Sequence, residues 1–469
     1  MSSSPKTKNR GLNIAVIGSG IAGLSSAWLL SRQHNVTLFE KDDRFGGHSN
    51  TVTLSGKNGQ IDVDTGFIVF NERTYPNLTA LFDYLDVPSS ETDMSFAVSL
   101  NNGKTEYAGT DLNGLFAQRK NLFSPRFWQM ITDILRFYRA SGEWQQTLGA
   151  NISLRQLLEK HSYSKAFVNE HLVPMGAAIW STPADKMLDY PALAFLRFCE
   201  NHGLLQLSDR PQWRTVTGGS REYVRRMIAD IGPHVLMNSC VRKVRRYPDR
   251  VEVLDIQGRE HTFDHVVMAC HADTTLKLLQ EPDELEQLLL GAFKFQRNRA
   301  LLHSDKRFMP RNRKAWASWN YLGNTSEATQ TQGNLGKGTG PAVTYWMNRL
   351  QHIDDLPLFV TLNPEMEPSM IHGSFLYDHP VFDQGAIEAQ TRLWELQGRN
   401  RTWFCGAWFA YGFHEDGLQS GLAVAEELGG QCRPWRVEGQ NDRLHLPEHW
   451  YSRATPTFTE ASFMQAGVR

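Results

Sequence analysis

Hydrophobic and polar positions near the N-terminus form short apolar runs separated by glycine-rich or polar gaps. The run Ile14–Ile17 has the composition of a buried strand, and Leu24–Leu30 continues with the apolar content of a helix. A second run, Asn35–Phe39, has strand character and ends at the acidic residue Glu40. This order predicts a strand, a tight turn, a helix and a second strand, which is typical of α/β proteins.

The rest of the chain alternates between strand and helix patterns. We expect strand character over residues 60–70, 235–241, 250–254 and 265–269. Helical periodicity is expected over residues 116–141, 153–171, 188–205 (apart from Pro191) and 422–428. Residues 323–340 are rich in Gly, Thr, Asn and Gln and predict a mobile loop. The first three helical stretches together predict a helical insertion that covers the N-terminal domain.

Three glycines fill the gap between the first strand and the first helix with G-x-G-x-x-G spacing. Gly18 permits the tight turn, Gly20 allows the backbone to approach a diphosphate, and Gly23 allows the helix to pack closely on the strand. The N–H groups of the first helical turn, at Ile21 and Ala22, would then face the diphosphate. Such glycine turns also occur without a ligand. The position of Glu40, where an acid would accept the ribose hydroxyls, makes dinucleotide binding the stronger interpretation.

A second glycine pair distinguishes between the two common dinucleotides. Gly46 and Gly47 lie just beyond Glu40 and Lys41 and are followed by His48. Paired glycines let backbone N–H groups approach a second anionic group or a flat ring, which favours FAD over NAD. The alternative is a flexible loop after a strand.

At this double glycine the sequence resembles the flavin amine oxidase/phytoene desaturase superfamily. Members carry a similar segment that usually ends in Arg, where this chain has His48. The resemblance implies FAD bound without a covalent link, in a Rossmann-like α/β domain. That domain is interleaved with a substrate domain of mixed sheet and helical insertion, the amine oxidase/glutathione-reductase-like FAD fold. It also implies that a turn at Gly66 and Phe67 lies near the flavin ring and that Val241 flanks the adenine.

The C-terminal third resembles the closing motif of the same superfamily. Gly406, Gly417, Leu418 and Ser420 would start a helix close to the cofactor, where its N–H groups stabilise negative charge on a reduced flavin. In the superfamily an acid usually follows the glycine, but here Ala407 occupies that position. Glu415 or Asp416 would compensate, or either would be an N-cap.

The resemblance divides the chain into interleaved segments. We expect FAD-binding parts at residues 11–75, 216–280 and 401–432. The substrate domain takes residues 76–215, with the helical insertion, and 281–400, with its sheet. Residues 433–469 form a C-terminal tail.

Composition and charge limit the remaining possibilities. The formal net charge of −1 and the isoelectric point near 7.0 give no global field for nucleic acid. The five cysteines are scattered, which favours free thiols in a reducing cytoplasm over disulfides or a zinc site, and no metal is expected. Residues 12–31 lack charge and are long enough to span a bilayer. Their glycines and serines, followed by a strand and Glu40, favour the strand–turn–helix unit instead. We expect a soluble protein.

Aromatic residues are the main candidates for a substrate channel. They are Trp316, Trp319, Tyr321, Tyr345, Trp346, Tyr377, Phe382, Trp408, Phe409, Tyr411 and Phe413. Any one of them is more often an ordinary core residue, but together they suggest an apolar channel. Tyr411 and His414 are the leading catalytic candidates because they lie inside the closing motif. No catalytic triad or metal-ligand spacing stands out, so the flavin should carry the chemistry.

Residues 344–350, 359–364 and 410–417 look like a bacterial subgroup that includes flavin-dependent desaturases of the furan fatty acid route. This resemblance implies a long-chain acyl or phospholipid substrate and hydride transfer from the chain to flavin N5. A flavin amine oxidase, a double-bond isomerase and a FAD-stabilised binding protein remain as alternatives. The electron acceptor stays open.

The stretch from Arg119 to Arg139 mixes cations with bulky apolar residues. One interpretation is an interfacial helix that contacts the inner face of a membrane and draws an acyl chain from phospholipid. The other is an amphipathic helix packed on its own domain with solvated arginines.

Overall fold

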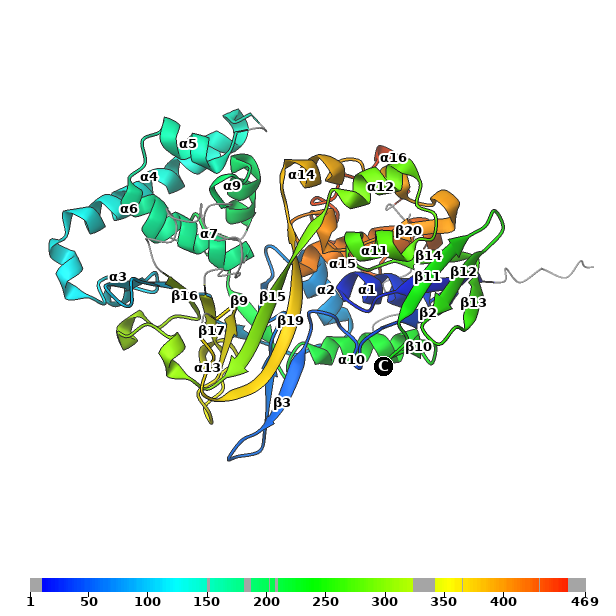
Figure 1. The fold of residues 1–469 in the computed structure, drawn as a ribbon, viewed down its shortest axis with the longest axis horizontal. Coiled ribbons are helices and arrows are strands. Elements are labelled where there is room, and N and C mark those ends of the chain that lie inside the picture. The colour runs from blue at the N-terminus through cyan, green and yellow to red at the C-terminus, as the bar shows by residue number, and fades with distance from the viewer. Residues whose placement is uncertain are drawn as a thin grey trace, which may run out of the picture.

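The computed structural model describes residues 11–149, 152–180, 187–201, 203–206, 210–323, 342–364, 366–429 and 431–453. It has the predicted α/β architecture, with a parallel sheet in one part of the molecule and a mixed sheet topped by helices in the other (Figure 1). Two long antiparallel strands, β15 (Lys294–His303) and β19 (Ile371–Val381), run between the two parts. The predicted loop at 323–340 lies outside the described residues except for Gly323.

The parallel sheet has five strands in the order β10-β2-β1-β14-β20. Their bounds are β1 Asn13–Ile17, β2 Asn35–Phe39, β10 Val235–Leu236, β14 His265–Met268 and β20 Thr402–Phe404. Every neighbouring pair is parallel, so the carboxyl ends of the strands lie along one edge. The chain therefore returns to this edge from segments hundreds of residues apart, as interleaved domains require.

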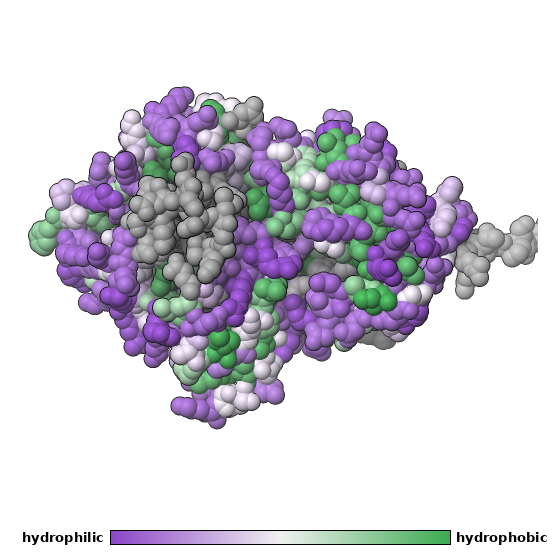
Figure 2. All heavy atoms as spheres, viewed as in Figure 1, coloured by the Kyte–Doolittle hydropathy of each residue, from purple (hydrophilic) through white to green (hydrophobic). Residues whose placement is uncertain are grey.

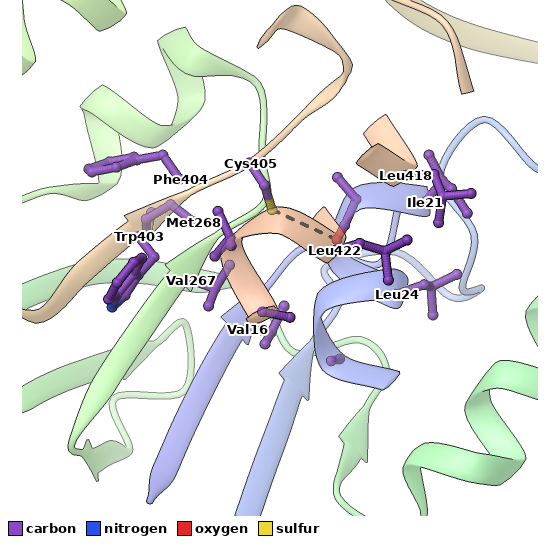
Figure 3. Close-up of a cluster of buried hydrophobic side chains, with 14 of the residues drawn as sticks. Val16, Ile21, Leu24, Val267, Met268, Trp403, Phe404, Cys405, Leu418 and Leu422 are labelled. Carbon is purple, nitrogen blue, oxygen red and sulfur yellow. Dashed lines mark hydrogen bonds between the residues drawn. The ribbon is translucent and has the colours of Figure 1, made fainter. Parts of the chain in front are cut away.

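Two helices pack against each other and against this sheet. Helix α1 (Ile21–Leu30) is buried along its whole length, and α15 (His414–Gly429) lies beside it. Val16, Leu24, Val267 and Leu422 lie in the resulting core, and the Phe404 side chain of the same buried cluster points away from the two helices (Figure 3). At about 1.5–3 kcal/mol for each large apolar side chain, this burial is the main stabilising term of the domain.

Glycine in α15 permits the close approach of the two helices. A Cβ atom on Gly421 would lie 2.3 Å from the carbonyl oxygen of Ala22 and 2.2 Å from Ser25 Oγ. A Cβ on Gly417 would lie 2.8 Å from Ile21 Cγ2. The backbone of α15 therefore rests almost directly on the first turns of α1.

The part of the chain expected to be the substrate domain contains a seven-stranded sheet in the order β19-β15-β18-β17-β16-β7-β8. The other strands are β7 Phe96–Leu100, β8 Thr105–Ala108, β16 Trp319–Gly323, β17 Ala342–Trp346 and β18 Phe359–Leu362. All pairs are antiparallel except β16 with β7.

The predicted helical insertion is present, in more pieces than the periodicity indicated. The helix expected over 116–141 is a 3-10 turn, η1 (Arg119–Phe123), followed by α4 (Pro125–Thr147). The break falls there because Ser124 caps α4 and Pro125 begins it. The remaining elements are α3 Leu112–Leu115, α5 Leu154–Lys160, α6 Lys165–Phe167, the π-helical turn η2 Val168–Leu172, α7 Val173–Trp180 and α9 Ala192–Asn201.

Smaller elements complete the fold. Strands outside the two large sheets are β3 Thr51–Ser55, β4 Gln60–Asp64, β5 Phe70–Asn71, β6 Ser89–Thr92, β9 Trp213–Val216, β11 Val241–Arg246, β12 Val251–Asp255 and β13 Glu260–Phe263. The helices are α2 Pro76–Tyr84, α10 Arg221–Ile231, α11 Ala272–Leu278, α12 Glu284–Gly291, α13 Met347–Leu350, α14 Gln384–Gln390 and α16 Glu448–Arg453. The 3-10 turns are η3 Lys306–Phe308, η4 Arg313–Ala315, η6 Leu393–Leu396, η7 Arg399–Arg401 and η8 Ala407–Phe409.

The strand expected over 235–241 is wrong as a single element. The chain turns between β10 and β11, where Asn238 adopts a positive φ of 52°. The strand expected over 60–70 also divides, into β4 and β5. Within the described residues no helix combines the length and apolarity that would let it cross a membrane.

The contact between α1 and α15 yields a first prediction. Gly421→Ala should destabilise the protein by about 1–3 kcal/mol, because the added methyl group meets backbone that cannot move aside. The measurement is the thermal unfolding midpoint.

The matched control is Gly142→Ala in α4, where a Cβ meets nothing within 4 Å. This change should stabilise the protein by up to about 1 kcal/mol, through helix propensity. Equal midpoints for the two variants would contradict the packing argument.

Candidate functional site

The candidate site lies at the carboxyl edge of the parallel sheet, where ligands bind in open α/β sheets. Gly18 follows β1 with φ +104°, so the predicted role of this glycine in the turn is confirmed. A Cβ on Gly23 would lie 1.8 Å from the carbonyl oxygen of Gly18, which confirms the predicted close packing. Glu40 directly follows β2. The segment Cys270–His271 comes after β14 with one residue between them.

The N-terminus of α1 fits a diphosphate. Its N-cap residue, Gly20, provides no side-chain cap, and no acidic residue lies in the first turn. Ile21 and Ala22 are buried, although a helix leaves its first N–H groups without partners inside the helix. A Cβ on Gly20 would meet nothing within 4 Å, so space adjoins these donors. A buried, uncapped helix end beside free space is the geometry that a phosphate group satisfies.

Glu40 lies on one side of this helix end. Its side chain is buried, and Oε2 accepts hydrogen bonds from Ser19 N (3.0 Å) and Ser19 Oγ (2.5 Å). The Asp42 N–H donates to Oε1 (3.0 Å), and the Ser239 N–H donates to the Glu40 carbonyl (2.7 Å). The segment that leads to Val241 therefore runs beside Glu40, as expected of residues around an adenosine. Lys41, in contrast, is exposed and pairs with Asp42.

The double glycine closes over the other side of the helix end. Gly46 and Gly47 both have positive φ, +110° and +58°. The Gly46 N–H donates to the Ser19 carbonyl and to Ser19 Oγ (both 3.1 Å). A Cβ on Gly47 would lie 3.0 Å from the Cα of Gly20. These positions bring the two glycine motifs into contact, so both fit one dinucleotide.

The turn at Gly66 lies next to the double glycine. The Phe67 N–H donates to the His48 carbonyl (2.7 Å), and a Cβ on Gly66 would lie 2.2 Å from that oxygen. The ring of Phe67 stacks on His414 with centroids 3.8 Å apart. His414 Nε2 lies 3.0 Å from Ser49 Oγ and 2.8 Å from Tyr223 OH. His414 is thus fixed by contacts with three other segments.

The strands β15 and β19 form a polar wall beside His48. The rings of Tyr377 and His379 lie 5.0 and 5.5 Å from the ring of His48, centroid to centroid. His379 Nδ1 is hydrogen-bonded to Asn298 Nδ2 (2.9 Å). Tyr377 OH accepts a hydrogen bond from Asn50 Nδ2 (2.9 Å). This wall joins the cofactor domain to the substrate sheet.

The histidines of this region are electrically neutral at ordinary pH. Burial lowers the pKa of His414 to about 3 and that of His379 to about 4. Burial and the neighbouring His379 ring hold the pKa of His48 well below its usual value. His271 contributes to the same effect, and burial also lowers the pKa of its own ring. The site therefore carries imidazole rings and not imidazolium cations.

The acidic residues of the closing motif have partners within the protein. Glu415 accepts hydrogen bonds from the N–H groups of Asn77 and Leu78 (3.0 Å each), and so caps α2. Asp416 accepts hydrogen bonds from the Phe413 N–H (2.8 Å) and Arg443 Nη1 (2.9 Å). Glu415, which was expected either to compensate for the missing acid or to be an N-cap, thus caps α2 with both of its oxygens.

Other residues of the closing motif lie as expected at the start of α15. Ser420 Oγ donates to the carbonyl of Gly406 (3.1 Å), and the Gly406 N–H donates back to it (3.0 Å). Gly417 and Leu418 are buried in the first turns of the helix, facing α1. The sulfur of Cys405 is directed at the Ala22 carbonyl (3.7 Å) (Figure 3). It is buried in the core, so its position agrees with FAD held without a covalent link.

The aromatic residues proposed as a channel separate into two groups. Trp408, Phe409 and Phe382 belong to the core of the cofactor domain. Tyr321 and Tyr345 pack inside the substrate domain. Tyr411, however, packs against both the cofactor-domain core and the core of the helical insertion. Tyr411 therefore lies where the helical insertion meets the candidate site.

Several residues of the site were not predicted from the sequence. Ser19 had a detectable signal, since it occupies the variable position between Gly18 and Gly20. Ser49, Tyr223 and Asn298 arrive from separate elements and have no motif that marks them. His271 lies just after β14, where the carboxyl-edge rule could have indicated it.

Gly20 and Gly23 give a paired test of the diphosphate site. Gly20→Val should leave a folded protein that binds FAD at least about a hundredfold (about 2.8 kcal/mol) more weakly, because its side chain enters the space beside the helix end. Gly23→Val should prevent correct folding, because a Cβ there overlaps the Gly18 carbonyl. Flavin absorbance and far-ultraviolet circular dichroism separate the two outcomes. Full FAD binding by folded Gly20→Val protein would exclude this helix end as the site.

The buried histidines predict loss of stability in acid. A histidine whose pKa is lower in the folded state takes up protons on unfolding, so stability falls as pH drops from about 6.5 toward the folded values of about 3–4. His414→Gln should flatten this decline in a series of unfolding midpoints against pH. His234→Gln, which changes an exposed side chain, should leave the decline as it is. An identical slope in both variants would show that His414 does not contribute.

Comparison with known proteins agrees with this geometry. The chain matches the family described as flavin containing amine oxidoreductase over residues 21–351, which is more than half of its length. It is 26% identical over 271 residues to a Mycobacterium tuberculosis protein named as a flavin-containing monoamine oxidase, covering 53% of this chain and 54% of that protein. It is 24% identical over 299 residues to the flavin-containing amine oxidase A of Bos taurus, covering 60% and 54%. The chain thus spans about half the length of these relatives.

Solved structures share the whole fold. A putrescine oxidase with bound putrescine superposes with a TM-score of 0.64 at 15% identity, covering 90% of this chain and 99% of that one. A CLA-producing fatty acid isomerase from P. acnes gives a TM-score of 0.63 at 13% identity, with the same coverage. At such low identity these likenesses concern the fold alone. By the family match, the chain belongs to the flavin-containing amine oxidoreductases, whose cofactor is FAD.

Proposed function

We propose that this protein is a FAD-dependent oxidoreductase that acts on a long-chain lipid, as a fatty acyl desaturase. Bound FAD supplies the redox chemistry by accepting two electrons from the substrate. The protein's own residues hold the cofactor and the chain in position and exclude water. The proposal rests on one observation above all: the buried histidines beside Gly66, which are His48, His379 and His414, carry no charge, and the cation Arg44 acts on His48.

The charge of the site supports a neutral substrate. His48, His379 and His414 are buried with lowered pKa values, so they carry no positive charge at neutral pH. The nearby carboxylates of Glu415 and Asp416 are already hydrogen-bonded to protein donors. Recognition of an ammonium group is normally based on a carboxylate or an aromatic cage directed at it. An acyl chain needs neither.

A third buried carboxylate is engaged in the same way. Asp64 accepts hydrogen bonds from Thr51 Oγ1 (2.6 Å), Ser220 Oγ (2.7 Å) and Gln351 Nε2 (2.9 Å). Burial nevertheless raises its pKa to about 6. Its role is therefore to fasten β4 to the start of α10, and it is not available to bind an amine.

The apolar surroundings of Tyr411 support a chain-like substrate. Tyr411 and Phe413 both pack on the apolar core of the helical insertion, which includes Phe137, Phe167 and Leu172. Apolar side chains thus continue from the closing motif into the insertion. A hydrocarbon chain that follows this direction would gain about 0.8 kcal/mol for each buried methylene group.

Specific observations also favour two other activities. An amine oxidase is favoured by the family match and by the names of the relatives. A double-bond isomerase is compatible with the shared fold of the CLA-producing fatty acid isomerase. An amine oxidase would oxidise an amine instead of an acyl chain, and an isomerase would yield an acyl product of unchanged mass.

The substrate class is tested with the FAD-loaded enzyme, lipid extracts and a panel of amines under anaerobic conditions. A desaturase should bleach the flavin with lipid and yield an acyl product that has lost two hydrogens, seen by mass spectrometry. An isomer of unchanged mass would indicate the isomerase instead. Rapid bleaching by a primary amine or polyamine, with no acyl product, would overturn the proposal.

Tyr411 and His414 should respond differently to substitution. Tyr411→Ala removes a side chain at the boundary with the insertion, so kcat/KM for lipid should fall at least about tenfold (about 1.4 kcal/mol) while FAD content is retained. His414→Ala removes the ring that links Phe67, Ser49 and Tyr223, so FAD retention itself should fall. The flavin-to-protein absorbance ratio and steady-state kinetics distinguish the two. Full lipid activity in Tyr411→Ala would rule out a substrate path past this residue.

A further inference from the structure

The end of the substrate domain farthest from the parallel sheet exposes an unusual number of large apolar side chains. Phe123 is 87% exposed, Leu112 74%, Trp128 46% and Leu122 40%. They lie on α3, η1 and the first turn of α4, at the left of the molecule in Figure 1. Single exposed apolar residues are common, but a group on consecutive elements marks an interaction surface.

These side chains are held in place by local contacts. Trp128 Nε1 donates to the Leu122 carbonyl (2.9 Å), and the Trp128 ring lies 5.5 Å from that of Phe116. Ser124 caps α4 through the Phe127 N–H (3.3 Å). The exposure of Phe123 is therefore a feature of a fixed turn.

Cations from three segments surround this apolar group. Lys104 comes from the turn between β7 and β8, Arg119 and Lys120 from η1, and Arg311, Arg313 and Lys314 from the region of η4. All six are exposed. We call them, with Leu112, Leu122, Phe123 and Trp128, the tip surface.

Hydrogen bonds join the three segments and leave the cationic charges uncompensated. Lys120 Nζ donates to the Lys104 carbonyl (2.8 Å), and Arg311 Nη2 donates to Asn102 Oδ1 (2.8 Å). Asn312 Nδ2 donates to the Ala117 carbonyl (2.6 Å). Among the residues that the structure describes, no ion pair involves the six cations of the tip surface.

Two acids lie close to these cations but do not neutralise them. Asp111 caps α3 by accepting from the Gly114 N–H (2.7 Å). Glu106 is buried and accepts from the backbone N–H groups of Arg311 (2.7 Å) and Asn312 (2.8 Å). The tip surface therefore keeps an excess of positive charge on a chain whose formal net charge is −1.

We propose that the tip surface docks on an anionic phospholipid bilayer. Phe123, Leu122 and Leu112 would enter the headgroup region, and Trp128 has the amphipathic ring that prefers this depth. The six cations match the negative surface potential of such a membrane. A second copy of the chain would bring like charges together if the same surface met itself, so charge complementarity favours lipid. This inference does not depend on what the enzyme oxidises.

The direct test is co-sedimentation of the FAD-loaded protein with vesicles of phosphatidylcholine alone or mixed with phosphatidylglycerol. The protein should bind the mixed vesicles and release them as salt rises above about 0.1 M. The double variant Leu122→Ser/Phe123→Ser should lower the partition coefficient about tenfold or more. Arg119→Glu/Lys120→Glu should lower it similarly, through charge.

Matched controls change one exposed apolar side chain and one exposed cation elsewhere in the chain. Ile256→Ser alters a side chain that is 63% exposed just after β12, and Lys57→Glu alters an exposed cation between β3 and β4. Both should bind vesicles as the unaltered protein does, and all variants should keep their flavin content.

Three results would overturn the proposal. The first is no preference of the unaltered protein for the anionic vesicles. The second is equal weakening by the control variants. The third is evidence that the tip surface binds another partner. This would be a change of oligomeric state of Leu122→Ser/Phe123→Ser in light scattering with unchanged vesicle binding, or binding of single-stranded DNA by the unaltered protein as tight as its binding of vesicles.

Discussion

The close backbone contact between α1 and α15 is the constraint on which the rest of the structure depends. It brings the start of the chain and its closing motif to one edge of the parallel sheet. Gly417 and Gly421 allow the approach, and Ser420 fastens the helix to Gly406 just after β20. The uncapped end of α1, the double glycine and the closing motif then lie in contact with one another. Apolar burial alone would not fix this geometry, because it lacks direction.

Desolvation gives the site its chemical character. Packing the polar wall of β15 and β19 against His48 removes water from several imidazole rings and keeps them neutral. The acidic side chains nearby are used to fasten elements together, as Glu415 does for α2 and Asp64 for α10. A region whose buried histidines are uncharged suits redox chemistry on a substrate that has no charge near the reacting carbon.

The part of this site that could be predicted from sequence is the part encoded locally. Gly18, Gly20, Gly23 and Glu40 belong to one strand–turn–helix–strand unit, so the local pattern predicted the bounds of β2, the turn at Gly18 and the close packing at Gly23. The double glycine could be recognised for the same reason. The helical insertion also followed from local periodicity, whereas the mixed sheet was expected only from the family resemblance, and none of its seven strands was predicted individually.

What could not be predicted depends on contacts between distant segments. Glu415 was expected near the flavin because of its place in the closing motif, but its partner Asn77 lies 338 residues away and no local pattern pairs them. Tyr223 and Asn298 reach the site by the same kind of long-range packing. The bend at Asn238 was missed because the apolar residues on both sides of it looked like one strand. Sequence patterns report which elements form, and tertiary contacts decide which side chains meet.

The account's central claim is that the glycine turn and the uncapped end of α1 bind the diphosphate of FAD. The most direct measurement is a fluorescence titration of the flavin-free protein with FAD and, separately, with riboflavin, which carries the same ring without the diphosphate and the adenosine. We predict that FAD binds at least about a thousandfold (about 4 kcal/mol) more tightly than riboflavin. Equal affinity for the two flavins would contradict the claim.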